Sequence, residues 1–331
     1  MLVIRLARSG SLGLPIIYVS WFDAMVYAEW SLADCALDGQ NLQTNGRVPE
    51  PHYQSMLTLF ILNSIAISTD ISQPIPPEYE LIWNDEFEGE GSPDSRYWTY
   101  EEGLVRNREL QWYQAENAFV QQGKLIIEAR QEPKENPHFQ ADSNNWKLNR
   151  PWIEYTSACI TTRNRLSWKY GLFEVKAKIK TQNGLWPAIW FLGQSGEWPS
   201  CGEIDLMEYY QGQILANACW GQKRRWQVQW DISKQLVASF NQPDWDQKFH
   251  LWRMEWSAQK IVLSMDGKIL NTIDLNQTIN SSDRGPTNPF HQPHYLLLNL
   301  AVGGDNGGDP DQTPFPSRYE IDYVRVYQQK N

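Results

Sequence analysis

Alternating apolar and charged residues over 171–180 predict a half-buried β-strand. Phe173, Val175 and Ala177 share one face with Ile179, whereas Glu174 and the lysines that follow it share the other. This alternation is typical of an antiparallel sheet with one face on the core. Further short runs rich in β-forming residues lie at 124–130, 252–256, 261–265 and 319–327.

Turn-forming residues separate these runs. Asp266-Gly267 lies between two of them and is a strong signal for a β-hairpin. No segment shows convincing helical amphipathicity. Many short strands with Gly, Pro and Asn between them predict an all-β fold, as a sandwich or a barrel. Residues 131–150 are polar and irregular, and we expect a long functional loop there.

The N-terminal part of the chain has a different character. Residues 1–55 show no sustained periodicity and stay unassigned. The apolar run 56–68 is too short to span a bilayer, and its small-residue end is typical of a secretory signal, although positive residues are missing at its start. A buried strand or a disordered leader is the alternative. If 56–79 is a signal peptide and linker, the protein is secreted, periplasmic or held at the cell surface. Met56 could then be the true start of translation.

Composition narrows the possible partners. The chain has 331 residues, a net charge of −10, and 17 Trp, 15 Tyr and 11 Phe. The acidic balance argues against nucleic acid as a partner, and the aromatic content excludes a long disordered protein. Four Cys without ligand spacing argue against structural zinc. The many Trp fit either a large aromatic core or a groove that stacks on sugar rings.

Three acids occur close together in Gly202-Glu-Ile-Asp-Leu-Met-Glu-Tyr209. On a regular strand Glu203 and Asp205 share a face, and Glu208 points to the other. One extra residue at Leu206-Met207, a β-bulge, returns Glu208 to the first face and leaves Ile204 and one of Leu206 and Met207 facing the core.

Crowded carboxyls are unfavourable unless one of them holds a proton. Glycosidic cleavage uses such a pair, because one carboxylate attacks while a neutral acid protonates the leaving oxygen. The alternatives are a solvated acidic face and a calcium site. The flanking aromatic residues fit the first poorly, and a calcium loop would be rich in Gly and Asp.

The acid segment resembles the active-site strand of glycoside hydrolase family 16, in the bulged form of its laminarinase-like members. The resemblance covers about 80–328 and extends to other segments in the same order, which are 83–87, 107–113, 171–178, 184–192, 298–304 and 321–327. It implies a concanavalin-like β-jelly-roll sandwich of two antiparallel sheets, with a carbohydrate groove on the concave sheet. It also implies endo-type cleavage of β-glycans with retention of configuration, by a hydrolase domain that we expect to be monomeric.

The resemblance assigns roles to single residues. Glu203 matches the nucleophile, Asp205 its helper, and Glu208 the general acid/base. Substrate-binding positions that match the family are Asn107, Glu109, Arg163, Trp186, Trp190, Trp198 and Trp220. Catalysis needs no cofactor. Many family members carry a structural calcium ion, for which Glu86, Gly123 and Asp322 are the matching positions; a simple salt bridge of Asp322 is the alternative.

The chain departs from the family pattern on the strand after the acids. Ala218 or Cys219 stands where laminarinase-like members usually have His, and Asn217 could replace it as a polar partner. The stretch 221–230 is unusually basic and aromatic, and it could be a solvated loop, a lid, or a contact for an acidic or sulfated glycan. Cys201 and Cys219 could form a disulfide, although cross-strand neighbours often cannot meet its geometry.

Three functions follow from this pattern. The leading hypothesis is a retaining endo-hydrolase of β-1,3- or mixed-linkage glucan, with transglycosylation as a variant. The second is a β-galactan hydrolase of the agarase, carrageenase or galactanase type. The third is a non-catalytic carbohydrate-binding protein on the same fold, which the intact acid triplet disfavours.

Overall fold

The computed structural model describes residues 73–281 and 286–330. Residues 1–55 and the apolar run 56–68 lie outside this part, so the predicted signal peptide stays a prediction. Across 73–281 and 286–330, no helix is long and apolar enough to cross a membrane.

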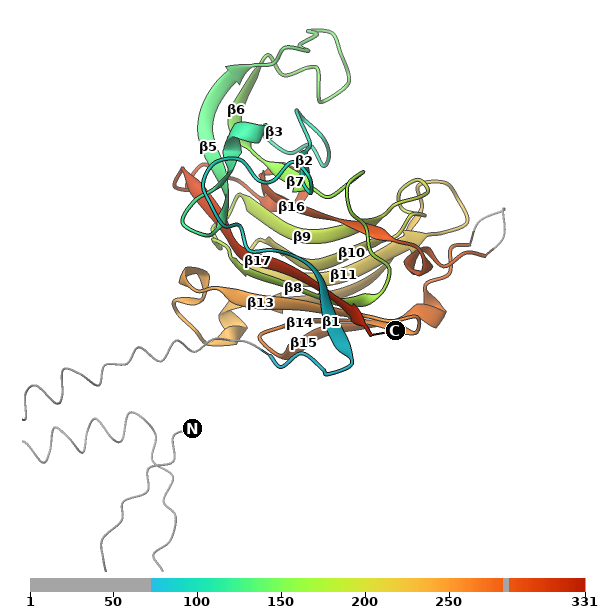
Figure 1. Ribbon diagram of the computed structural model, residues 1–331. Coiled ribbons are helices and arrows are strands. Elements are labelled where there is room, and N and C mark those ends of the chain that lie inside the picture. The colour runs from blue at the N-terminus through green and yellow to red at the C-terminus, as the bar shows by residue number, and fades with distance from the viewer. Residues whose placement is uncertain (1–72, 282–285, 331) are drawn as a thin grey trace, which may run out of the picture. The chain divides into compact units, whose positions relative to one another are not determined.

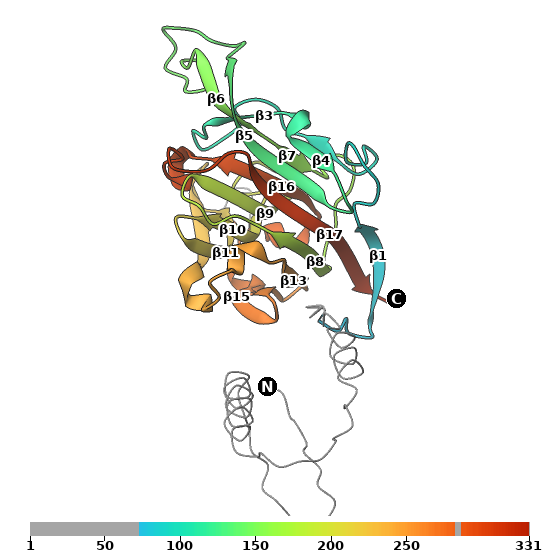
Figure 2. The same cartoon turned by 90° about the vertical axis from the view of Figure 1, so that its left-hand side faces the viewer.

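Two stacked β-sheets make up the described residues (Figures 1 and 2). The first, here called the outer sheet, has ten strands: β1 (Tyr79–Asp85), β3 (Gln111–Tyr113), β4 (Ala118–Val120), β5 (Leu125–Glu135), β6 (Trp152–Ser157), β8 (Gly171–Lys178), β13 (His250–Trp256), β14 (Lys260–Met265), β15 (Lys268–Asp274) and β17 (Ser317–Gln329). Its order is β15-β14-β13-β8-β17-β5-β6-β3, with β1 also on β17 and β4 also on β5.

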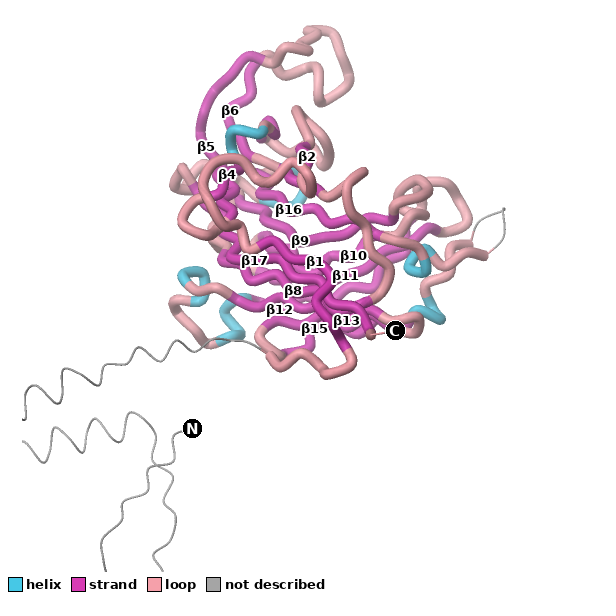
Figure 3. The backbone as a smooth tube through the Cα atoms, viewed as in Figure 1, coloured by secondary structure: helices cyan, strands magenta, loops and turns pink. Residues whose placement is uncertain are grey.

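The second sheet, here called the groove sheet, has seven strands within the described residues. They run in the order β12 (Val228–Leu236), β11 (Gln213–Gly221), β10 (Glu203–Tyr210), β9 (Leu185–Gly193), β16 (His294–Val302), β7 (Cys159–Thr161) and β2 (Thr99–Tyr100). Helices of this part of the chain are short (Figure 3): α3 (Gly304–Gly307), η2 (Ala115–Asn117), η3 (Val237–Phe240), η4 (Trp245–Gln247), η5 (Leu275–Gln277) and η6 (Pro289–His291).

The predicted all-β sandwich is confirmed, with one difference in strand direction. Every pairing is antiparallel among the described strands except that of β3 with β6, which is parallel. The predicted loop 131–150 also begins later than expected, because Lys134 and Glu135 pair with Ile153 and Trp152 and so extend β5. The connection that remains caps the arm formed by β5 and β6, which extends beyond the rest of the sandwich in Figures 1 and 2.

The predicted hairpin at Asp266-Gly267 is confirmed. Met265 pairs with Lys268 across a two-residue turn, and both turn residues have positive φ, 49° and 82°. This conformation is strained for most residues but accessible to Asp and Gly, which explains why this dipeptide marks the turn.

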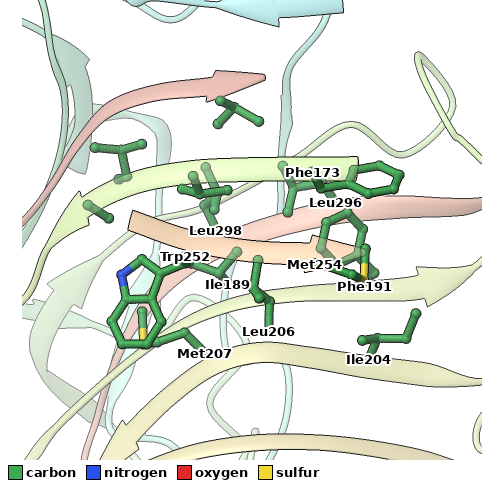
Figure 4. Close-up of a cluster of buried hydrophobic side chains, with 14 of the residues drawn as sticks. Phe173, Ile189, Phe191, Ile204, Leu206, Met207, Trp252, Met254, Leu296 and Leu298 are labelled. Carbon is green, nitrogen blue, oxygen red and sulfur yellow. The ribbon is translucent and has the colours of Figure 1, made fainter. Parts of the chain in front are cut away.

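The main core lies between the two sheets (Figure 4). Phe173, Trp252 and Met254 contribute from the outer sheet, and residues such as Ile189 and Phe191 from the groove sheet. Phe173 and Phe191 meet edge to face, with their ring centroids 5.4 Å apart. Because side chains alternate along a strand, the other face of the groove sheet is left for the site.

The charged face of β8 is less solvated than the alternation predicts. Glu174 accepts hydrogen bonds from Arg253 on β13, at 3.0 Å from Nε, and both side chains are buried. The guanidinium of Arg253 also donates to the carbonyl of Gln73 at 2.9 Å. The segment before β1 therefore covers this part of the outer face, which local periodicity could not reveal.

Truncation of Phe191 tests the inter-sheet core. We expect Phe191→Ala to lower the free energy of unfolding by about 3–5 kcal/mol, because it removes a fully buried ring and leaves a cavity. The matched control is Trp152→Ala, since Trp152 is 52% exposed and its loss leaves no cavity. Denaturant unfolding measures both variants; equal losses would contradict this account of the core.

Candidate active site

The three acids lie on β10, between β9 and β11, and the predicted bulge is present. Asp205 pairs with Trp190 and Asn217, whereas Glu208 pairs with Ala188 and Leu215. Three steps along β10 therefore match two steps along each neighbour, so β10 carries one extra residue. The extra residue turns Glu208 to the groove side of the sheet.

The bulge buries both apolar residues between the acids. Leu206 and Met207 are each 0% exposed and belong to the main core. The sequence predicted that only one of them faces inward, and that expectation is wrong. The bulged residue Leu206 adds a second apolar contact to the core instead of pointing away from it.

A groove of about 570 Å³ lies on this face of the groove sheet. Its floor comes from β9, β10, β11, β12 and β16, and one side comes from the loop that carries Arg106 and Asn107. The predicted residues that line it are Asn107, Glu109, Trp186, Trp190, Trp198, Glu203 and Glu208. Asn217, expected from the sequence as a polar partner, also lines the groove, and so does Trp230, the last residue of the stretch 221–230. The lining residues that the sequence prediction did not include are Arg106, Ala188, Leu192, Tyr210, Leu215, Ile232, Lys234, Asn299 and Asn306.

Glu208 is placed and polarised by two side-chain donors. Trp186 Nε1 donates to its Oε1 at 3.0 Å, and Asn217 Nδ2 donates to its Oε2 at 3.4 Å. Burial, and then the nearby Glu203 carboxylate, raise the pKa of Glu208 to about 7. Glu208 can therefore hold a proton near neutral pH, as a general acid must.

Asp205 lies deepest of the three acids. It is 1% exposed, and its Oδ2 has no hydrogen-bond partner in the described part of the chain. Burial, followed by the charges of Glu208 and Glu203, holds the pKa of Asp205 well above its ordinary value. A neutral Asp205 lowers the repulsion that three adjacent carboxylates would otherwise create.

Glu203 has donors that favour its charged form. Burial raises its pKa, and hydrogen bonds from Trp198 and Asp205 and the charge of Arg106 oppose that rise. Trp198 Nε1 donates to Glu203 Oε2, and the Cys219 thiol lies 3.9 Å from the same oxygen. This environment suits a carboxylate that has to act as a nucleophile.

A polar network forms the side of the groove near Asn107. Asn107 Nδ2 donates to Glu109 Oε1 at 3.2 Å, and Gln111 Nε2 donates to Glu109 Oε2 at 2.7 Å. Arg106 pairs with Glu101, and its guanidinium carbon lies 4.9 Å from the ring centroid of Trp190. The sequence prediction missed Arg106, although it directly precedes the segment 107–113 that resembles the family.

Two predicted substrate contacts do not line the groove. Trp220 is only 8% exposed and packs in the core, with its ring 6.5 Å from that of Phe290. Its neighbour Cys219 faces Glu203, so alternation along β11 turns Trp220 to the other face, and the prediction for Trp220 is wrong. Arg163 follows β7, is exposed, and lies over the Tyr295 ring at 5.6 Å, outside the groove lining.

Two of the three predicted calcium residues, Glu86 and Asp322, are engaged in ion pairs. Glu86 accepts two hydrogen bonds from Arg325, at 2.8 and 2.9 Å, and Asp322 lies 3.0 Å from Lys176 Nζ. Within 73–281 and 286–330, no group of three or more His, Cys, Asp or Glu side chains could hold a metal ion. In this arrangement each of the two carboxylates is paired with a basic side chain. Cys159, Cys201 and Cys219 are free thiols.

The comparisons with known proteins agree with this geometry. The family model "Glycosyl hydrolases family 16" matches residues 107–325. A β-glucanase of Rhodothermus marinus is 35% identical over 263 residues, which cover 76% of this chain and 86% of that protein.

Two solved structures are similar along most of the described chain. One comes from work on endo-acting O-glycanases with which human gut bacteria initiate mucin breakdown. It has a TM-score of 0.70 and 32% sequence identity, and the match covers 78% of this chain and 94% of that one. The other is the catalytic domain of an endo-1,3-β-glucanase (laminarinase) of Thermotoga petrophila, with a TM-score of 0.62, 32% identity, and coverage of 76% and 99%.

The chain therefore belongs to glycosyl hydrolase family 16, and the resemblance seen in its sequence is confirmed. It is a glycosidase with the jelly-roll fold of that family.

Asn217 offers a test of how the site holds the Glu208 proton. Its Oδ1 accepts the Ser233 backbone N–H at 3.2 Å, so its amide N–H groups face the acids. These donors favour the charged form of Glu208, and their loss raises its pKa. For Asn217→Ala we expect the alkaline limb of kcat/KM, near pH 7 in the wild type, to move to higher pH.

The control for that test is Ser233→Ala, which removes a hydroxyl bonded to the Leu270 carbonyl but keeps the backbone N–H. Its alkaline limb should match that of the wild type. A limb that moves to lower pH in Asn217→Ala would contradict the placement of Asn217.

Proposed function

We propose that this protein is a retaining, endo-acting β-glycan hydrolase whose leading substrate is β-1,3- or mixed-linkage glucan. The observation that carries the proposal is the bulge, which gathers Glu203, Asp205 and Glu208 on the groove side of β10. The substrate class is supported by the β-glucanase and endo-1,3-β-glucanase among its relatives.

The first step forms a glycosyl ester. The Glu203 carboxylate attacks the anomeric carbon, and the bond from that carbon to the glycosidic oxygen breaks. Glu208 gives its proton to this oxygen, so the leaving chain departs as a neutral alcohol. The pKa of Glu208, about 7, keeps the proton available in weakly acidic and neutral solution.

The second step hydrolyses the ester. Glu208, now ionised, takes a proton from water while the water oxygen attacks the anomeric carbon and the bond to Glu203 breaks. Two displacements at one carbon restore its configuration. Asp205 stays protonated beside Glu203 and stabilises the carboxylate that leaves.

The dimensions of the groove suit attack within a chain. Its lining draws on five neighbouring strands of the groove sheet, from β16 to β12. At about 4.8 Å between strands, these span roughly 19 Å, which leaves room for several sugar rings. Trp186, Trp190 and Trp198 line the groove, and Trp198, which is 38% exposed, offers the most accessible aromatic surface of the three.

A β-galactan hydrolase is the second candidate. Cys219 lies 3.9 Å from the nucleophile, where laminarinase-like enzymes would carry a larger and more polar His. This difference changes the surface next to the reacting sugar and so favours a change in sugar specificity. A purely carbohydrate-binding role has no use for the three crowded acids.

Two finer proposals concern the surroundings of the enzyme. The apolar segment from Met56 supports export, which would place the enzyme where polysaccharides occur. Calcium at Glu86, Gly123 and Asp322 stays a prediction, and it would require the ion pairs with Arg325 and Lys176 to open.

Substitution of the catalytic acids tests the mechanism. We expect Glu203→Gln and Glu208→Gln each to lower kcat at least about 10³-fold, because either change removes an essential carboxyl. Affinity for laminarin should stay within about threefold of the wild type, since the groove keeps its shape. Reducing-sugar release and calorimetric titration are the measurements.

The control is Glu197→Gln, an exposed acid that pairs with Arg225 outside the groove lining. It should retain activity. Full activity in either catalytic variant would reject the mechanism.

A substrate panel tests the sugar. Laminarin, lichenan, agarose, carrageenan and β-1,3-galactan are incubated with the enzyme, and product size and anomeric form are followed. We expect internal cleavage of laminarin or lichenan with β-anomers formed first. Release of fragments from a galactan alone would replace the leading substrate with the second candidate.

A further inference from the structure

Lys234 is an exposed cation on the groove side of β12. Leu215 pairs with Lys234 on one side and with Glu208 on the other, so the lysine lies in the same cross-strand row as the acid, two strands away. Both residues line the groove, and the charge of Lys234 acts on Glu208. The register therefore places a positive charge on the groove side of the sheet, in the same row as Glu208 and separated from it by Leu215.

Two cations near the groove have carboxylate partners. Arg106 pairs with Glu101, and Arg225 pairs with Glu197 at 2.7 Å. Among the described residues, Lys234 forms no ion pair, and its ammonium lies 5.9 Å from the Tyr210 ring centroid. The charge of Lys234 thus remains available to a ligand in the groove.

Lys234 lies on the side where the leaving part of the glycan is expected. The resemblance to family 16 implies that Asn107 and Glu109 contact the non-reducing side of the glycan, and the loop that carries them lies at the end of the groove lining opposite β12. Along β12, Trp230 and Ile232 face the groove before Lys234, and Ile232 is 55% exposed. Together these three side chains, here called the β12 shelf, offer an apolar surface that ends in a cation.

The charge balance of the groove indicates which ligand needs this lysine. A neutral sugar can be held by hydroxyl and amide groups alone, whereas an anionic sugar is repelled by Glu203 and by any ionised Glu208. A lysine beside these acids offsets that repulsion and can form a charge-assisted hydrogen bond. A substituent with a negative charge is the ligand that gains most from it.

We propose that Lys234 binds an anionic substituent, a sulfate ester or a carboxylate, on the sugar at the leaving-group side of the groove. This inference rests on the proposed function, because it assumes that Glu208 protonates the oxygen of that sugar. In this proposal the β12 shelf is the surface by which the enzyme distinguishes anionic glycans from neutral ones.

The test compares Lys234→Met with the wild type on one backbone in three forms: laminarin, sulfated laminarin and carboxymethyl laminarin. We expect Lys234→Met to lower the ratio of kcat/KM for an anionic form over the neutral form about fivefold, the effect of roughly one exposed ion pair. Loss with only one derivative identifies which anion is bound. Assays below pH 6 keep Glu208 protonated, so that a change in its pKa does not affect the ratio.

The matched control is Lys268→Met, which removes the same charge at the β14–β15 turn, outside the groove lining. Its ratio should equal that of the wild type. An unchanged ratio in Lys234→Met, or an equal fall on all three forms, would overturn the proposal.

Binding separates this proposal from the proposed function. In a Glu208→Gln background, titration with each anionic derivative is repeated with and without Lys234→Met, at low and high salt. A fivefold loss of affinity that disappears at high salt supports the anion site even if the wild type cleaves no laminarin. Equal affinities overturn it, whatever the outcome of the cleavage assays.

Discussion

One extra residue in β10 sets the face to which every side chain after Asp205 points. Three steps along this strand match two steps along both β9 and β11, so the pairing register changes by one residue against both neighbouring strands. Leu206 and Met207 anchor it, because both are buried in the core between the sheets. Packing of the apolar residues thus holds Glu203, Asp205 and Glu208 on one side of the sheet, with Glu203 and Glu208 lining the groove.

This arrangement brings three carboxyls close together, and the resulting repulsion and burial shift the pKa of each acid differently because their surroundings differ. Burial and mutual repulsion hold Asp205 neutral and bring the pKa of Glu208 to about 7. Burial raises the pKa of Glu203 as well, but hydrogen bonds from Trp198 and Asp205 and the charge of Arg106 oppose that rise. Three similar carboxyls thereby differ in how readily they hold a proton, which is what the proposed two-step displacement needs. Asn217 on β11 and Lys234 on β12 both lower the pKa of Glu208, and so limit the rise that burial causes.

Much of the site could be predicted from the sequence, since its central part is local. The spacing of the acids implies the bulge, and the surrounding segments resemble one family. The errors arose where a residue's direction depends on its neighbours in the sheet. Trp220 resembles a sugar platform, but its face is decided by Cys219, which lies opposite Glu203 on β11. No local sequence pattern marks Arg106, Ile232 or Lys234 as groove residues, because their place in the groove depends on the neighbouring strands and loops.

Strand periodicity, the hairpin at Asp266-Gly267 and the bulge between the three acids followed from the sequence by itself, because each depends on residues a few positions apart. The tertiary structure alone decided that Lys234 lines the groove, that Trp220 packs in the core, and that Glu86 and Asp322 pair with cations from other strands. These features depend on pairings between residues far apart in the chain. The register of the sheets creates such pairings, and local sequence patterns do not encode them.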